Sequence, residues 1–153
     1  ADGGPAWPSN YLSNDYWEEQ IKQNLDDFHG DAAIRFFLFD RANPTVVVGS
    51  ANLNNIVRGA AQYCNLGYSI AQDREGKHMM KEALQSVISY GFSALNLHRI
   101  MANYQPSNQR SGWLLRSLGF NVEGYARDYL LINGKWCDHI LTSMLNPNWI
   151  AKD

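Results

Sequence analysis

The stretch LGYSIAQDREGKHMMKEA, Leu66 to Ala83, decides the fold of this chain. A short strand-like run leads into a charged turn with one glycine, and an amphipathic helix follows. The first turn of a helix has backbone N–H groups without partners and partial positive charge, so this turn predicts an anion site. Gly76 permits close backbone approach, while Arg74 and Lys77 add donors suited to a diphosphate. An ordinary strand-to-helix turn stays equally open, because one glycine without a following Ser or Thr is a weak motif.

Apolar patterns on either side of this stretch predict one mixed α/β domain over residues 1–153, built on a single twisted sheet. The β-branched and aromatic runs at 32–40 and 45–53 indicate an antiparallel hairpin, and 62–70 supplies a third strand. Because a helix intervenes, the alternating run at 98–104 can lie parallel to the third strand. Asn133 and Gly134 join the last two strand-like runs in a type I′ turn.

Three helices are expected from apolar residues at helical spacing. The first should begin near Asn14 and end before Gly30, after an irregular arm at residues 1–13. The second runs from about Gly76 to residue 92, and the third from Asn108 to about residue 118, with Gly119 as its C-cap. The first and third helices are expected to turn these side chains toward the core: Trp17, Ile21, Leu25, Phe28, Trp113, Leu114 and Leu118.

Charge and composition limit the expected partners. Thirteen Lys and Arg against fifteen Asp and Glu give a net charge of −2, so the overall field attracts neither nucleic acid nor an anionic membrane. No apolar run reaches the roughly 18 residues of a membrane span, and no signal peptide is evident, so we expect a cytoplasmic protein. Cys64, Cys137 and the four histidines have no metal-ligand spacing, so no metal is expected.

Three blocks of sequence carry a family resemblance: GYSIAQDREGKHMMKEAL at 67–84, RIMANYQPSNQRSGWLLRSLGF at 99–120 and EGYARDYLLINGKWCDHILTSML at 123–145. In this order they resemble the Gcn5-related N-acetyltransferase (GNAT) superfamily over about residues 32–149. Within it the chain is most similar to the RimJ/RimL branch of ribosomal-protein-alanine N-acetyltransferases, and to the RimJ type. The resemblance implies a mixed sheet in which the parallel strands at 62–70 and 98–104 splay apart, with acetyl-CoA as cosubstrate in the gap.

The same resemblance implies where the coenzyme binds. Its pyrophosphate would contact backbone amides from Arg74 to Met79, and its pantetheine arm would lie along Tyr68 to Ile70. The residues so assigned are Tyr68, Ser69, Ile70, Arg74, Glu75, Gly76, Lys77, His78, Met79, Asn108 and Ser111. The chain departs from the family pattern at Asp73 and at His78, whose Cβ stands where a glycine or alanine usually permits close backbone approach.

Catalytic roles also follow from the resemblance. Ser111 matches a serine that would protonate the leaving thiolate. A related branch uses a glutamate base and a tyrosine acid, but those positions hold Asn103 and Leu115, which cannot transfer a proton. On the strand before the last turn, Asp128, with Glu123 and Tyr129 nearby, is best placed to face the acceptor. We therefore assign catalysis to Ser111, Asp128 and Tyr129; a salt-bridged or solvated surface carboxylate stays open for Asp128.

An N-terminal α-amine suits a site with no strong base. Its pKa is about 7.7–8, whereas a lysine at about 10.4 needs roughly 3.5 kcal/mol more to lose its proton near pH 7.5. We therefore expect direct attack on the thioester by the N-terminal α-amine of a ribosomal protein, with alanine as its first residue. A backbone N–H near Ser69 or Ile70 would stabilise the oxyanion, without a covalent intermediate on Cys64 or Cys137. The alternatives are a small-amine acetyltransferase for polyamines, amino sugars or antibiotics, and a non-catalytic acyl-CoA-binding protein.

The family normally has a further strand and helix before the segment at Asn14, and no apolar run here could form them. We therefore expect an incomplete chain. The strand at 32–40 would then be an exposed edge whose FFLF segment can pair with another molecule. The chain is expected to be a monomer or an edge-paired homodimer.

Overall fold

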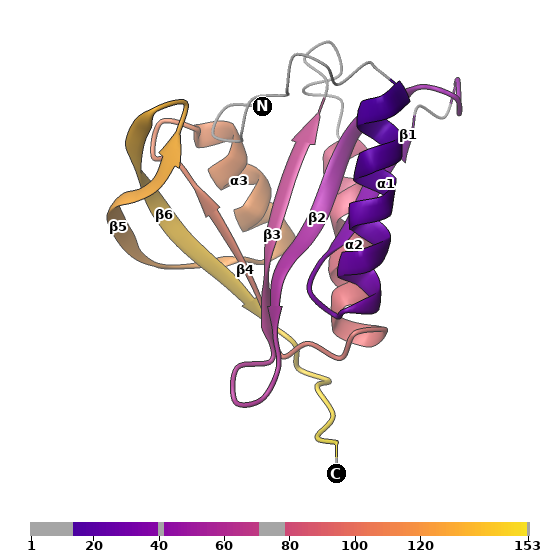
Figure 1. Cartoon of the computed structure of the whole chain (residues 1–153). Coiled ribbons are helices and arrows are strands. Elements are labelled where there is room, and N and C mark those ends of the chain that lie inside the picture. The colour runs from indigo at the N-terminus through magenta and orange to yellow at the C-terminus, as the bar shows by residue number, and fades with distance from the viewer. Residues whose placement is uncertain (1–13, 40–41, 71–78, 153) are drawn as a thin grey trace.

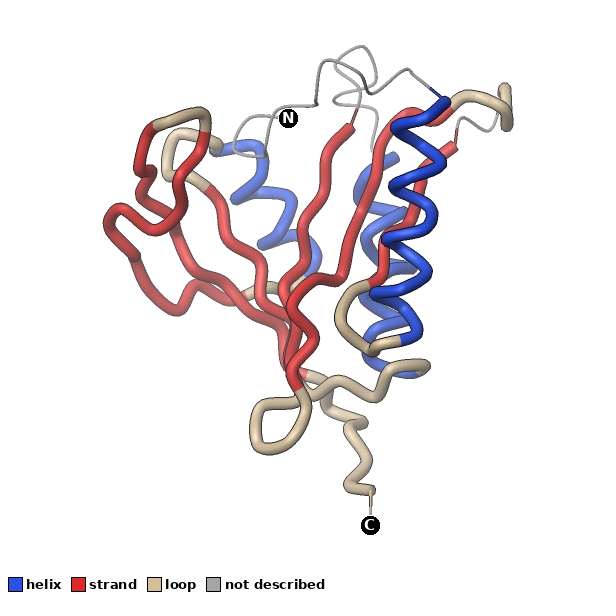
Figure 2. Tube along the Cα trace, in the orientation of Figure 1, coloured by secondary structure: helices blue, strands red, loops and turns tan. Residues whose placement is uncertain are grey.

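The computed structural model describes residues 14–39, 42–70 and 79–152; the side chains at 14–18, 20, 21 and 70 lie outside this description. The elements are α1 (Asn14–His29), β1 (Ile34–Phe39), β2 (Val47–Val57), β3 (Tyr63–Ile70), α2 (Met79–Ser93), β4 (Arg99–Tyr104), α3 (Gln109–Leu118), β5 (Asn121–Ile132) and β6 (Lys135–Leu145). The six strands form one sheet in the order β1-β2-β3-β4-β6-β5. α1 lies over one face of the sheet, and α2 and α3 lie on the other face (Figure 1, Figure 2).

The β3–β4 pair is parallel and short, while the other neighbouring strands are antiparallel. Its ladder has three residue pairs, Tyr63 with Arg99, Cys64 with Ile100 and Asn65 with Met101. Both strands continue beyond the ladder, and Figure 1 shows them diverging toward their C-terminal ends. The predicted splay is therefore present, and the sheet opens into a wedge.

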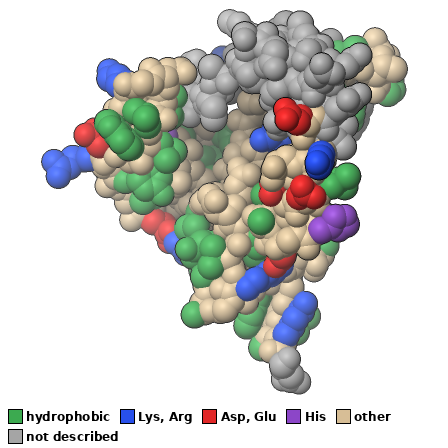
Figure 3. Space-filling view, in the orientation of Figure 1, with side chains coloured by type: hydrophobic (Ala, Val, Ile, Leu, Met, Phe, Trp, Pro, Cys, Tyr) green, Lys and Arg blue, Asp and Glu red, His purple; other side chains and the backbone are tan. Residues whose placement is uncertain are grey.

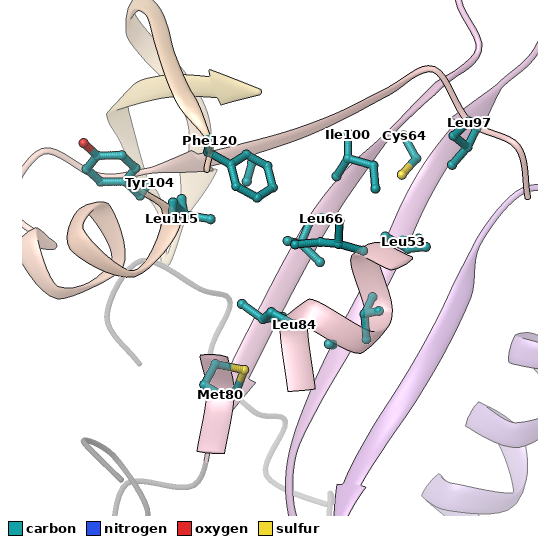
Figure 4. Packing of buried hydrophobic residues seen from close by; sticks show 14 residues of the cluster. Leu53, Cys64, Leu66, Met80, Leu84, Leu97, Ile100, Tyr104, Leu115 and Phe120 are labelled. Atoms are coloured by element: carbon teal, nitrogen blue, oxygen red, sulfur yellow. The ribbon is translucent and has the colours of Figure 1, made fainter. Parts of the chain in front are cut away.

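The core lies between the sheet and the helices α2 and α3. Strand alternation sends Leu53 of β2 and Cys64 and Leu66 of β3 to this side, where Leu84 of α2 and Leu115 of α3 meet them. Figure 4 shows these side chains pointing toward one another. Burial of this apolar surface holds α2 and α3 against the strands that form the wedge.

The turn and cap signals gave correct positions. Asn133 and Gly134 have φ angles of 51° and 77°, as a type I′ turn requires. α3 has Asn108 as its N-cap and Gly119 as its C-cap, with a φ of 103° at the glycine. β2 is longer than predicted, because Asn54 still pairs with Asn65 and an irregularity follows, with a φ of 52° at Asn55.

Three side chains expected in the core are exposed. Leu25 and Phe28 of α1 are 53% and 47% exposed, and α1 packs on β1 at the edge of the sheet. The side chains of Trp17 and Ile21, expected on the same stripe, lie outside the described part of the chain. Trp113 of α3 is 69% exposed, whereas Leu115 is 1% exposed. These two positions are about 200° apart around a helix, so the helix face that buries Leu115 turns Trp113 to solvent.

β1 is an edge strand of the sheet, as expected, and Phe39 at its end is exposed. Pairing of this edge with a second copy stays a prediction, which size-exclusion chromatography can test. Among the described residues, none of the helices has both the length and the apolar character that a membrane span requires. The same part of the chain holds no group of three or more His, Cys, Asp or Glu side chains positioned for a metal ion.

Candidate active site

The site begins with the wedge between β3 and β4. From Leu66 to Ile70, β3 keeps its pairing with β2 but has no ladder partner on β4. Because the backbone groups of a strand point alternately to its two sides, part of this segment presents N–H and C=O groups to the gap. An extended ligand with amide groups could pair with this open edge, as a further strand would.

A hydrogen bond crosses the wedge on the side of α3. The Tyr68 hydroxyl on β3 bonds to the Ser111 hydroxyl in the first turn of α3. Burial raises the pKa of Tyr68, and the bond to Ser111 opposes this shift in part. Tyr68 therefore stays protonated near neutral pH and can supply a proton to Ser111. The sequence assigned these residues separate roles; the structure brings them together.

Asn108 fixes the turn that carries Ser111. Its side-chain Oδ1 accepts a hydrogen bond from the Ser111 backbone N–H at 3.1 Å, so Asn108 is the N-cap of α3. Ser69, also assigned to the coenzyme, lies beside Tyr68 on β3 and so faces the opposite side of the sheet. Its hydroxyl is 3.4 Å from that of Ser50 on β2.

The predicted pyrophosphate loop lies mostly outside the described residues. This applies to Arg74, Glu75, Gly76, Lys77 and His78, so their assignment to the coenzyme stays a prediction. Of the flanking residues, Ile70 ends β3 and Met79 begins α2, where it is partly buried.

The strand β5 carries the carboxylates predicted to face the acceptor, and their surroundings differ in the structure. Glu123 forms an ion pair with Arg99 of β4. Asp128 is exposed and has a φ of 46°, at the irregularity between Ala126 and Leu130. Glu123 is thus engaged in a surface ion pair, whereas the side chain of Asp128 is open to solvent.

Asp138 of β6 holds this irregular segment in place. Its carboxylate accepts hydrogen bonds from the Tyr125 hydroxyl and, at 2.8 Å, from the Asp128 backbone N–H. The bond from Tyr125 is the larger cause, and the bond from the Asp128 N–H the smaller cause, of a lowered pKa at Asp138. The hydrogen bond to Asp138 also raises the pKa of Tyr125. The bulge that contains Tyr129 is therefore tied to the partner strand.

The sequence analysis missed His139 of β6. Its side chain is 1% exposed, and its Nδ1 lies 2.9 Å from the Cys137 carbonyl oxygen. The Tyr129 ring packs beside it, with ring centroids 5.7 Å apart. Strand alternation and the register across the Asn133-Gly134 turn could have placed His139 on a sheet face. The irregularity in β5, which brings Tyr129 beside it, gave no sequence signal.

The other positions considered for catalysis, Leu115, Asn103 and Cys64, have surroundings typical of structural residues. Leu115 is buried in the core, and Asn103 lies on the sheet face opposite to Tyr104 of β4. Cys64 also faces the core, and burial raises the pKa of its thiol to about 12. A thiol with so high a pKa is a poor nucleophile, because little thiolate forms near neutral pH.

Comparisons with known proteins agree with this fold. The family profile described as "Acetyltransferase (GNAT) domain" matches residues 5–121. The [Ribosomal protein uS5]-alanine N-acetyltransferase of Escherichia coli (strain K12) is 47% identical over 134 residues, which are 87% of this chain and 68% of that protein. The spermidine N(1)-acetyltransferase of Vibrio cholerae is 27% identical over 132 residues, 80% of this chain and 74% of that protein.

Two solved structures are similar over most of the chain. The ribosomal-protein-S5-alanine acetyltransferase from Vibrio fischeri has a TM-score of 0.90 and 35% identity, covering 99% of this chain and 82% of that chain. Mycobacterium smegmatis RimJ in complex with CoA-disulfide has a TM-score of 0.78 and 28% identity, covering 84% of this chain and 60% of that chain. The chain therefore belongs to the GNAT family of acetyltransferases.

Proposed function

We propose that this N-acetyltransferase transfers the acetyl group of acetyl-CoA to the N-terminal α-amine, an alanine's, of a ribosomal protein. The observation that carries the proposal is the β3–β4 wedge with Tyr68 and Ser111 bonded across one side of it. The 47% identity to an enzyme named for alanine acetylation on ribosomal protein uS5 supports the acceptor. An acceptor of this kind places the reaction in the cytoplasm.

The donor side uses the backbone of β3 and the starts of two helices. The open edge from Leu66 to Ile70 would pair with the amides of the pantetheine arm, and the loop before α2 would hold the pyrophosphate. The bound thioester supplies the activated acetyl group. An N–H near Ser69 or Ile70 would stabilise the oxyanion, because a strand edge presents fixed donors where charge develops.

Ser111 would return a proton to the leaving thiolate. Its hydroxyl bonds to Tyr68, whose raised pKa keeps the phenol protonated. When Ser111 gives up its proton, Tyr68 can replace it through this existing bond. The Asn108 cap supports this role, because it fixes the backbone of Ser111 in the first turn of α3.

The acceptor would approach from the sheet face opposite to α3. The molecular surface on that face is recessed between the β5–β6 hairpin and the central strands (Figure 3). Asp128 and Tyr129 lie on this hairpin, and a solvated carboxylate such as Asp128 would attract a positively charged N-terminus. Part of any α-amine population is neutral near pH 7.5 and can attack directly.

The test is thiol release from acetyl-CoA with two classes of acceptor. A peptide that begins with the N-terminus of a ribosomal protein, starting with Ala, is compared with spermidine at equal concentration. We expect faster turnover with the peptide, and no turnover with the same peptide after its α-amine has been blocked. Faster turnover with spermidine would contradict the proposal.

A small-amine acetyltransferase is the second candidate, supported by the likeness to the spermidine enzyme of Vibrio cholerae. A non-catalytic coenzyme A binder is the third. Acetyl-CoA at about a hundred times its Kd should stabilise the fold by about 2.7 kcal/mol in all three cases. Stabilisation without thiol release for any acceptor would identify the passive binder.

A further inference from the structure

His139 has a buried imidazole ring, and within the described part of the chain only one of its two nitrogens has a hydrogen-bond partner. A carbonyl oxygen can only accept a hydrogen bond, so the contact with Cys137 requires the proton on Nδ1 of the neutral ring. Nε2 then carries a lone pair and has no hydrogen-bond partner among the described residues. The exposed part of this side chain is small, at 1%.

The sheet register places this ring on the acceptor face. On β6, Ile140 pairs with Tyr104 of β4, and Leu141 pairs with Asn103. Alternation puts Ile140 on the side of α3, so His139 shares a face with Leu141 and Asn103, away from Ser111. It lies one residue beyond the Tyr104 pair, at the open end of the wedge.

This separation matches the chemistry of acyl transfer. The amine and the thiolate occupy different directions around the thioester carbon, so one group can take a proton from the amine while a different group protonates the thiolate. Ser111 and Tyr68 lie on the α3 side of the sheet. A second group that accepts a proton from the amine would then lie on the other face, where the carboxylate of Glu123 is already paired with Arg99.

The hairpin holds the imidazole in one orientation. Asp138 ties the bulge of β5 through the Tyr125 hydroxyl and the Asp128 N–H. This bulge sets the Tyr129 ring beside His139, and the Cys137 carbonyl fixes the other side of the imidazole. A ring fixed in one tautomer needs no reorganisation before it accepts a proton.

We propose that His139 is the proton acceptor for the attacking amine, directly or through one water molecule; this rests on the proposed function. The neutral amine forms an N–C bond to the thioester carbon, and the C–S bond breaks with its electron pair on sulfur. Nε2 of His139 takes one proton from the nitrogen, and Ser111 gives one to the thiolate. Exchange with solvent then restores both groups, so protons and charge balance.

Two substitutions separate a proton acceptor from a structural residue. His139→Asn keeps a side-chain N–H that can reach the Cys137 carbonyl but has no basic nitrogen. His139→Ala removes both and leaves space for an added base. We expect kcat to fall about 100-fold or more in each variant, since general-base catalysis contributes roughly 10² to 10⁴. Acetyl-CoA binding, measured by calorimetry, should match the wild type and report correct folding.

Chemical rescue by an added base distinguishes the two roles, because it is not expected if His139 is only structural. Imidazole added to His139→Ala should raise kcat in a saturable manner, whereas pyrrole, of similar size but without a basic lone pair, should not. His98→Asn is the matched control, because His98 is exposed and packs on Trp149 near the other end of β4. Its kcat should equal the wild-type value.

Each outcome has one meaning. Suppose that the wild type is active. A near-normal kcat in His139→Asn, or equal rescue of His139→Ala by imidazole and pyrrole, would then overturn the role of His139 and leave the proposed function in place. A wild type that releases no thiol with peptide or spermidine would overturn the proposed function and this assignment together. If His139→Ala does not fold, the kcat of His139→Asn decides between the two roles.

Discussion

The hydroxyl of Ser111 is the residue-scale feature on which the proposed chemistry of the donor depends. Ser111→Ala removes the proton donor but keeps the backbone N–H that Asn108 caps, so α3 should stay intact. We expect kcat for thiol release to fall about 100-fold, with little change in the Kd of acetyl-CoA. Ser117→Ala on the same helix is the control, because among the described residues that hydroxyl bonds only to the Leu114 carbonyl of its own helix. An unchanged kcat in Ser111→Ala would contradict the role.

The two cysteines should take no part in catalysis. Cys64 is buried with its pKa raised to about 12, and Cys137 is partly buried in β6. Alkylation of the folded protein should therefore leave Cys64 unmodified, and modification of Cys137 should leave activity in place. Mass spectrometry after incubation with acetyl-CoA checks the same point, since an acetyl thioester on either residue would refute direct attack.

At the scale of elements, the packing of α3 on β4 sets the position of Ser111. A Cβ at Gly112 would lie 2.9 Å from ring atoms of Tyr104, which is buried. Gly112→Ala should therefore push α3 from β4. Overpacking costs about 1–3 kcal/mol and exceeds the roughly 1 kcal/mol that alanine gains in a helix. Thermal unfolding should show a lower melting temperature, and kcat should fall with it.

Gly124→Ala is the control for this substitution, because a Cβ there has nothing within 4 Å and the backbone has no positive φ. Its melting temperature should equal or exceed that of the wild type. Equal stability of the two alanine variants would mean that α3 does not depend on close approach to Tyr104.

The elements themselves could largely be predicted from the sequence, because local signals define them. Caps, the Asn133-Gly134 turn and apolar spacing gave α3 and the β5–β6 hairpin within a few residues. The face that each helix buries was less predictable. Leu25 and Trp113 are apolar at helical spacing, yet their exposure depends on where the helix lies against the sheet.

The candidate site was predictable only in part, for the same reason. Tyr68 and Ser111 were assigned by resemblance, but their hydrogen bond joins residues 43 positions apart and has no local signal. His139 was missed because its burial and its contact with Tyr129 depend on the bulge of β5. A single sequence shows residue types and spacing, whereas this bulge depends on hydrogen bonds between two strands.

At the scale of the whole molecule, Arg58 connects three separate segments. Its guanidinium bonds to Asp31 after α1, to the Leu95 carbonyl after α2 at 2.8 Å and to the Gln62 side chain. The hydrogen bond from Arg58 lowers the pKa of Asp31 below its ordinary value. Both side chains are more than a third exposed, so the pair contributes only about 0.2–1 kcal/mol.

This ion pair predicts a pH dependence of stability. Because the folded pKa of Asp31 is lowered, its contribution is present above the unfolded value and is lost as pH falls through the folded value. Asp31→Asn should therefore be slightly less stable than the wild type at pH 7, and the difference should disappear as pH falls from about 5 to about 2. Urea unfolding at both ends of this range measures it. Asparagine tolerates the φ of 55° at this position, and Asp26→Asn on α1 serves as the control.

The three-pair ladder between β3 and β4 also has a mechanical consequence. It joins two half-sheets, β1-β2-β3 and β4-β6-β5, and we expect small movements of one half-sheet against the other at this short pairing. A donor molecule bound in the gap would contact both half-sheets, so its binding should also reduce their relative motion. Hydrogen–deuterium exchange should slow at residues 66–70 and 102–104 when acetyl-CoA is added, and unchanged exchange there would show that the halves were already rigid.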